Sequence, residues 1–173
     1  MSTGAASDDN VSVMDFFFSG EFGLDAPIDE VWPVVLDYTT WQDFRTAENV
    51  SGKPGEPGEI VRLLKVTEDF ETPLYLARTI VLEPGRIVWK VYPETSGDGN
   101  EFLGAVGFSG YVDFQVRENG PSAVVFTYNA VYESLVEYEQ ESELTDFEKK
   151  TYEEYGAMFD AMWVRLRKLV EKD

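Results

Sequence analysis

The sequence of 173 residues contains no cysteine and no histidine. Without cysteine there can be no disulfide, no thiolate metal ligand and no cysteine nucleophile. Without histidine the chain lacks the commonest general base and the commonest metal ligand. The carboxylates that remain do not show the spacing of a calcium-binding loop. We therefore expect neither a metal nor a cofactor.

Basic residues are also scarce, with 14 lysines and arginines against 33 acidic residues and a formal net charge of −19. Such a surface repels nucleic-acid phosphates and anionic lipid headgroups, so nucleic acid is not an expected partner. The early apolar run Phe16-Phe17-Phe18 is far too short to span a membrane. The first ten residues hold two aspartates and no basic residue, unlike a secretory signal, and the expected location is the cytoplasm.

Aromatic residues are abundant, with 12 Phe, 9 Tyr and 4 Trp in a chain that is 43% hydrophobic. This composition and length are typical of one globular domain with a sizeable core. We expect a flexible N-terminal tail over residues 1–12 and a single domain over residues 13–173.

Hydrophobic periodicity and turn residues predict the order of the elements. A strand is expected from Met14, then a helix opened by Pro27 and a short helix over 40–44. A loop over 51–58 follows, then strands over 60–66, 74–82, 86–92, 103–117 and 123–133. Thr145 and Glu148 form a capping-box signature, so a long amphipathic helix is predicted over 145–171. The acidic run from Glu133 to Glu148 is expected to be a solvated loop, or alternatively a lid.

Several local motifs carry a resemblance to a known superfamily. Ala26-Pro27, Val31-Trp32 and Asp37-Tyr38 are followed by Trp41 and by the glycine-containing loop over 52–58. With the element order, they resemble the START-like (SRPBCC) superfamily, which includes polyketide cyclases, pollen allergens and lipid-transfer domains. The resemblance implies an α+β helix-grip fold. In this fold a curved antiparallel sheet of six to seven strands surrounds a long C-terminal helix, and two short helices follow the first strand.

A strongly curved sheet cannot lie flush on a straight helix, so we expect an apolar ligand cavity between them. The candidate ligand-binding residues on the helix are Tyr155, Met158, Phe159 and Met162, among which the methionines adapt to varied apolar ligands. On the last strand, Phe126 and Tyr128 are expected to face the cavity, with the phenol hydroxyl orienting a ligand or donating a proton. For each residue the alternative is an ordinary packed core.

Two more candidates depend on the Pro84-Gly85 turn. A two-residue turn would pair Ile80 with Trp89 and Arg78 with Val91, which places Trp89 and Arg78 on one inward, apolar face. A buried arginine requires an anionic or carbonyl partner, either a ligand carboxylate or an acid of the core. The alternative is that Arg78 extends to the rim.

The register of the preceding hairpin decides whether Arg62 or Lys65 shares a face with Arg78, and the sequence does not fix it. Which way a strand faces therefore determines which cations could meet a ligand.

The leading functional hypothesis is binding, or transport, of a small hydrophobic molecule such as a lipid, isoprenoid or polyketide. One alternative is an enzyme resembling the cyclase and dehydrase branch, in which Arg78 and a tyrosine would stabilise an enolate. A third is a protein-interaction domain of the chaperone-activator type, which a filled cavity and an exposed apolar patch would favour. The sequence leaves the ligand, turnover and the oligomeric state open.

Overall fold

The computed structural model describes residues 10–41, 46–66, 71–93 and 108–171. The elements, in chain order, are β1 (Val11–Leu24), α1 (Ile28–Leu36), α2 (Tyr38–Trp41), β2 (Thr46–Ser51), β3 (Ile60–Val66), β4 (Glu71–Glu83), β5 (Arg86–Pro93), β6 (Phe108–Glu118), β7 (Val124–Glu137) and α3 (Glu141–Val170).

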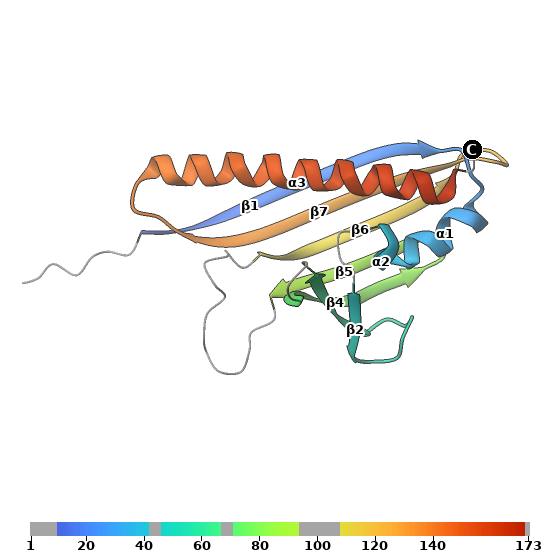
Figure 1. Ribbon diagram of the computed structural model, residues 1–173, viewed down its shortest axis with the longest axis horizontal. Coiled ribbons are helices and arrows are strands. Elements are labelled where there is room, and N and C mark those ends of the chain that lie inside the picture. Colours follow the sequence, from blue (N-terminus) through green and yellow to red (C-terminus); the bar gives the residue numbers. More distant parts are fainter. Residues whose placement is uncertain (1–9, 42–45, 67–70, 94–107, 172–173) are drawn as a thin grey trace, which may run out of the picture.

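The seven strands form one antiparallel sheet in the order β1-β7-β6-β5-β4-β3-β2. The first strand therefore pairs with the last, and each other strand pairs with its neighbours in sequence. Figure 1 shows the strands turning from nearly along the long axis at β1 to nearly across it at β2, which is the twist and curvature of the sheet. Helix α3 lies over β1 and β7 (Figure 1).

This architecture confirms the predicted helix-grip fold, with two short helices between the first two strands. The structure corrects some boundaries. Strand β1 begins at Val11, and strand β2 was not predicted at all. The expected tail falls mainly on residues 1–9, and the expected start of the 103–117 strand falls on 103–107; both lie outside the described residues. No helix in the described part of the chain is long and apolar enough to cross a membrane.

Helix α3 begins four residues earlier than predicted. Its capping box is formed by Gln140 and Glu143, whose side chain accepts hydrogen bonds from the backbone N–H groups of Glu139 (2.7 Å) and Gln140 (3.2 Å). Thr145, the predicted cap, lies inside the helix. The predicted acidic loop is wrong for the same reason: Glu133 and Glu137 belong to β7, and the residues from Glu141 onward belong to α3. The described acidic run is therefore ordinary secondary structure, not a lid.

The register between β4 and β5 departs from the prediction at a β-bulge. Leu82 pairs with Ile87 as expected, but Thr79 pairs with Trp89, and the register shifts between Thr79 and Val81. The extra residue, Ile80, moves Arg78 to the outer face, where it is exposed, and brings Thr79 inward. A bulge inserts one residue without disturbing the pairs beyond it. It spares the fold the cost of burying a guanidinium among apolar side chains.

Candidate functional site

The concave face of the sheet carries the core, because alternate residues of each strand point towards α3. On β1, Phe16 and Phe18 are 1% and 8% exposed. Their partners across the ladder, Tyr132 and Ala130 of β7, are buried as well. The inward residues of β6 and β7 continue this apolar surface with Phe114 and Phe126, among others.

Helix α3 meets this surface through a row of rings that we call the aromatic seam. Its strand residues are Phe16, Phe18, Phe22, Phe114, Phe126, Tyr128 and Tyr132, and its helix residues are Trp41, Tyr152, Tyr155, Phe159 and Trp163. Phe18 stacks on Tyr155 with ring centroids 5.3 Å apart, and Tyr128 stacks on Phe159 at 4.5 Å. Successive aromatic residues along β1 contact successive aromatic residues along α3. The helix therefore runs along this strand and does not cross the whole sheet.

Two local features shape the seam. A Cβ atom at Gly20 would overlap the ring of Tyr128, so glycine at this position lets that ring lie across β1. Trp41 of α2 closes the other side, because its indole N–H donates to the Val35 carbonyl (3.2 Å) and its own carbonyl accepts from Nε of Arg165 (2.9 Å). The strands, α2 and α3 are thereby fixed around one small volume.

The seam encloses a void of about 10 Å³. It is lined by Phe22, Trp41, Phe114, Phe126, Tyr128, Phe159, Met162, Trp163 and Leu166. Such a volume holds about one water molecule at most, whereas sites for small organic ligands span about 300–1,000 Å³. The open apolar cavity that we expected is thus replaced, within the described residues, by packed rings.

The predicted site residues separate into three groups. Phe126, Tyr128, Phe159 and Met162 line the void together. Tyr155 and Met158 pack against the core beside it, and Trp89 is buried in edge contact with Phe114 (5.4 Å between centroids) without lining the void. Arg78 lies on the opposite side of the sheet. Apolar periodicity along β1 and α3 signalled an apolar surface, but five residues that line the void were not predicted: Phe22, Trp41, Phe114, Trp163 and Leu166.

The phenols at one end of the seam are held in the neutral form. Burial raises the pKa of Tyr132 well above its usual range, with the neighbouring Tyr75 adding to the shift. Burial likewise raises the pKa of Tyr155, which also hydrogen-bonds to Tyr75. Burial, followed by the charge of Asp160, raises the pKa of Tyr128. These groups can donate hydrogen bonds at neutral pH but are poor bases.

A buried hydroxyl lies near these phenols. Ser134 follows Tyr132 on the concave face, is 1% exposed, and its hydroxyl has no hydrogen-bond partner in the part of the chain that the structure describes. An unsatisfied buried hydroxyl costs about 1–3 kcal/mol, so a polar group placed here would be favourable.

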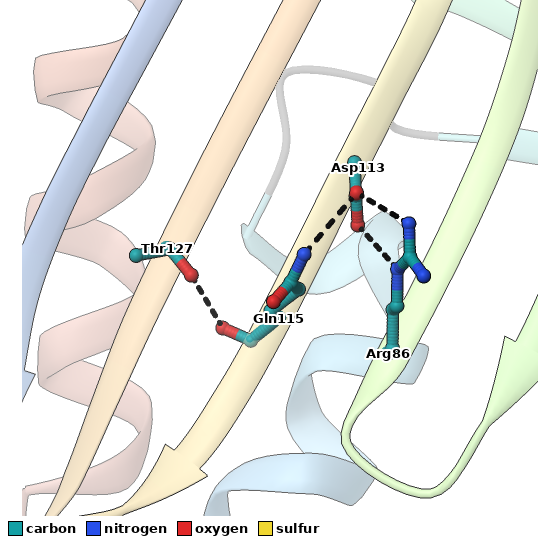
Figure 2. A network of polar contacts seen from close by, with 4 residues as sticks. All are labelled: Arg86, Asp113, Gln115 and Thr127. Carbon is teal, nitrogen blue, oxygen red and sulfur yellow. Dashed lines mark hydrogen bonds and ion pairs between the residues drawn. The ribbon is translucent and has the colours of Figure 1, made fainter.

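The convex face has a different chemistry. Arg86 donates from Nε and Nη2 to both carboxylate oxygens of Asp113 (3.1 and 2.9 Å), and Gln115 donates to Asp113 (3.2 Å), as Figure 2 shows. The side-chain hydroxyl of Thr127 donates to the Gln115 carbonyl at 3.5 Å. This network ties β5, β6 and β7 together on the outside. The hydrogen bond and charge of Asp113 raise the pKa of Arg86.

Arg78 lies on this convex face, so it cannot reach the seam. The predicted pairing of Arg78 with a tyrosine around an enolate is therefore wrong. Arg62 pairs with Leu76 across β3 and β4, so it shares a face with Arg78. That face is the convex one, where Arg62 forms an ion pair with Glu48. Among the described residues, no group of three acidic, histidine or cysteine side chains is placed to hold a metal ion.

The sequence matches no known family model and no curated protein. Solved structures do match. An uncharacterized protein from Rhizobium leguminosarum is 14% identical with a TM-score of 0.62, covering 95% of this chain and 99% of that one. Norcoclaurine synthase from Thalictrum flavum, in complex with dopamine and hydroxybenzaldehyde, is 19% identical with a TM-score of 0.52, covering 99% and 98%. The Zhui aromatase/cyclase from Streptomyces is 14% identical with a TM-score of 0.55, covering 90% and 94%.

These similarities extend over nearly the whole of each chain at identities that establish fold alone. They confirm the helix-grip fold that the element order and the motifs around Trp32 and Trp41 indicated.

Proposed function

Given its START-like helix-grip fold, we propose that the protein binds a small hydrophobic molecule with an aromatic or isoprenoid body between the sheet and α3. The observation that carries the proposal is the void at the centre of the aromatic seam, enclosed by rings together with Met162 and Leu166. Solved proteins of this fold include one in complex with dopamine and hydroxybenzaldehyde, both aromatic compounds. We also propose the cytoplasm as the location of the protein.

The void is much too small for such a ligand, so binding requires the seam to open. Met158 and Met162 have flexible, unbranched side chains that repack readily, and Trp163 is only partly buried. We expect the ligand to take the place of these side chains and to stack on Tyr128 and Phe159. Aromatic stacking contributes about 0.5–1.5 kcal/mol beyond area burial.

Neutral hydrogen-bond donors would set the ligand's orientation. The hydroxyls of Tyr132 and Tyr155 stay protonated because burial raises their pKa, and the Ser134 hydroxyl lies on the same face. A carbonyl or hydroxyl on the ligand would satisfy the Ser134 hydroxyl. Arg78 faces away from the seam, and rings with neutral phenols suit an uncharged ligand best, so the proposed ligand is neutral.

The proposal is tested by titrating the protein with N-phenyl-1-naphthylamine, a neutral fluorescent aromatic probe. We expect micromolar binding. Met162→Trp should weaken it by filling the void, and Met162→Leu, which nearly conserves volume, should leave it close to wild type. Phe17→Ala removes an exposed ring from the convex face and is the matched control.

Two outcomes would contradict the proposal: a folded protein that binds no probe, or binding that is insensitive to Met162→Trp and lost in Phe17→Ala. The second outcome would favour the protein-interaction alternative. That alternative has two observations behind it. The seam is nearly filled, and the convex face has an exposed apolar strip formed by Val13, Phe17, Tyr111, Val131 and Leu135. Phe17, Val131 and Tyr111 are direct neighbours across β1, β7 and β6.

A further inference from the structure

Most described cations of this acidic chain have an acidic partner, but two on the convex face do not. Arg117 pairs with Glu21 (3.0 Å) and Arg86 with Asp113 (2.9 Å), both on the outer side of the sheet. Arg78 and Lys90, on the same side, have no carboxylate within ion-pair distance in the described ranges. With 33 acidic residues against 14 basic ones, two neighbouring cations that have no acidic partner among the described residues are unexpected.

These two cations are also direct partners across the ladder. Arg78 of β4 pairs with Lys90 of β5, and both side chains are exposed. Like charges directly opposite one another on a sheet are destabilising. The repulsion between the two cations should therefore lower the stability of the fold slightly. The bulge at Ile80 places Arg78 on the convex face, opposite Lys90. An anion between the two side chains would remove the repulsion.

The surface around them is hollowed. Arg78, Lys90, Tyr92 and Ser109 line an open depression of about 390 Å³, which we call the basic depression. Tyr92 lies two residues beyond Lys90 on β5, and Ser109 lies on the neighbouring strand β6. The ammonium of Lys90 is 5.8 Å from the ring centroid of Tyr111, an exposed ring of β6 that pairs with Lys90 across the ladder.

We propose that the basic depression binds the anionic group of a small aromatic compound, a carboxylate or a phosphate monoester. The guanidinium of Arg78 supplies a planar fork for two oxygens, and Lys90 supplies a point charge. The hydroxyls of Ser109 and Tyr92 are further donors, and the ring of the ligand would lie against Tyr92 and Tyr111. This site is separate from the seam, because it lies on the other face of the sheet.

The negative charge of the molecule opposes any such binding, and one described acidic residue beside the depression is Glu133. Glu133 pairs with Ser109 across β7 and β6 and is exposed. At physiological ionic strength charges more than about 8 Å away are largely screened, so the local cations dominate. Glu133→Gln should consequently tighten binding modestly, and high salt should weaken it.

The experiment is a nuclear magnetic resonance titration of the whole chain with phenyl phosphate, benzoate and phenol. We expect phenyl phosphate, benzoate or both to shift the amide signals of Arg78, Lys90 and Ser109 at millimolar concentration, and phenol to shift none. Which of the two anions binds more tightly identifies the anionic group. Arg78→Met should weaken binding about tenfold or more, because it removes charge-assisted hydrogen bonds. Arg78→Lys should weaken it less.

Arg86→Met is the matched control, since it removes an arginine from the same face that already has a carboxylate partner. It should leave the affinity nearly unchanged. No shift with either anion, equal shifts with phenol, or equal weakening by Arg78→Met and Arg86→Met would each overturn the proposal. Because N-phenyl-1-naphthylamine is neutral and its proposed site is the seam, its binding should be unaffected by Arg78→Met, which separates failure of this site from failure of the seam.

Discussion

Three consecutive phenylalanines of β1 show how different the two faces of the sheet are. Phe16 and Phe18 point to the concave face and are 1% and 8% exposed, whereas Phe17 points outward and is 55% exposed. The concave face is covered by α3 and filled with rings. The convex face carries ion pairs, the basic depression and a strip of exposed apolar side chains. A shift of one residue along a strand therefore moves a side chain from the core to the surface.

The two faces of the sheet suit ligands of different charge. The seam offers rings and neutral phenols, so it suits an uncharged apolar molecule. The basic depression offers Arg78 and Lys90 in water, so it suits an anion. No single small ligand can use both, because the sheet lies between them.

The largest expected effect is the contrast between adjacent phenylalanines. Phe16→Ala should lower the free energy of unfolding by about 3–5 kcal/mol, because it leaves a cavity beneath α3. Phe17→Ala should change it by no more than about 0.5 kcal/mol, as exposed positions usually do. Denaturant unfolding of the two variants checks this. Similar losses at the two positions would mean that the convex strip is covered in solution.

A second contrast concerns the void. Met162→Trp inserts a larger side chain into a space of about 10 Å³, so overpacking should cost about 1–3 kcal/mol of unfolding free energy. Met162→Leu should cost less than about 1.5 kcal/mol. Thermal melts of the two variants give the comparison. A Met162→Trp protein as stable as wild type would show that the seam opens without penalty.

The pH dependence of stability separates buried from exposed phenols. Tyr132 and Tyr155 have a raised pKa in the folded state, while the unfolded chain has the usual value near 10. Above pH 10 the unfolded state ionises and the folded state does not, so stability is intact below pH 10 and is lost as the pH rises further. Each tyrosine should contribute about 1.4 kcal/mol per pH unit in that window.

The Tyr132→Phe variant is the check on that assignment. Denaturant unfolding above pH 10 should show a shallower loss of stability with pH than wild type. An unchanged slope would contradict a buried, neutral Tyr132 hydroxyl.

The smallest effect on stability is expected at Arg78. Arg78→Met removes an exposed cation that makes no described ion pair and faces Lys90, so the free energy of unfolding should shift by no more than about 0.5 kcal/mol. A loss of about 3–5 kcal/mol would instead indicate that Arg78 pairs with a buried acid. Chemical denaturation of this variant decides between the two.

Most of the architecture could be predicted because its signals are local and repeated. Alternating apolar residues marked β1, β5 and β7, and three- and four-residue spacing marked α3. The start of α3 was harder to predict, because Thr145-Glu148 and Gln140-Glu143 are both plausible capping pairs; the structure has the earlier one. Strand β2 has little apolar alternation and is held by its pairing with β3.

The facing of Arg78 could not be predicted for a physical reason. The predicted register assumes that each residue of β4 before the Pro84-Gly85 turn pairs with one residue of β5. The bulged residue Ile80 has no partner, so the register shifts by one and Arg78 faces the other side. The only hint was the arginine itself, which is costly to bury. The size of the void could not be read from the sequence either, because ring packing depends on how closely α3 approaches the sheet.

The central claim, that ligand binds in the seam, is tested most directly by following the fluorescent probe and the amide exchange of α3 in one titration. We predict that N-phenyl-1-naphthylamine alters hydrogen exchange around Phe159, Met162 and Trp163 and that Met162→Trp weakens both signals at the same probe concentration. Probe binding that leaves exchange in α3 unchanged, and alters it instead around Phe17 and Val131, would contradict the account.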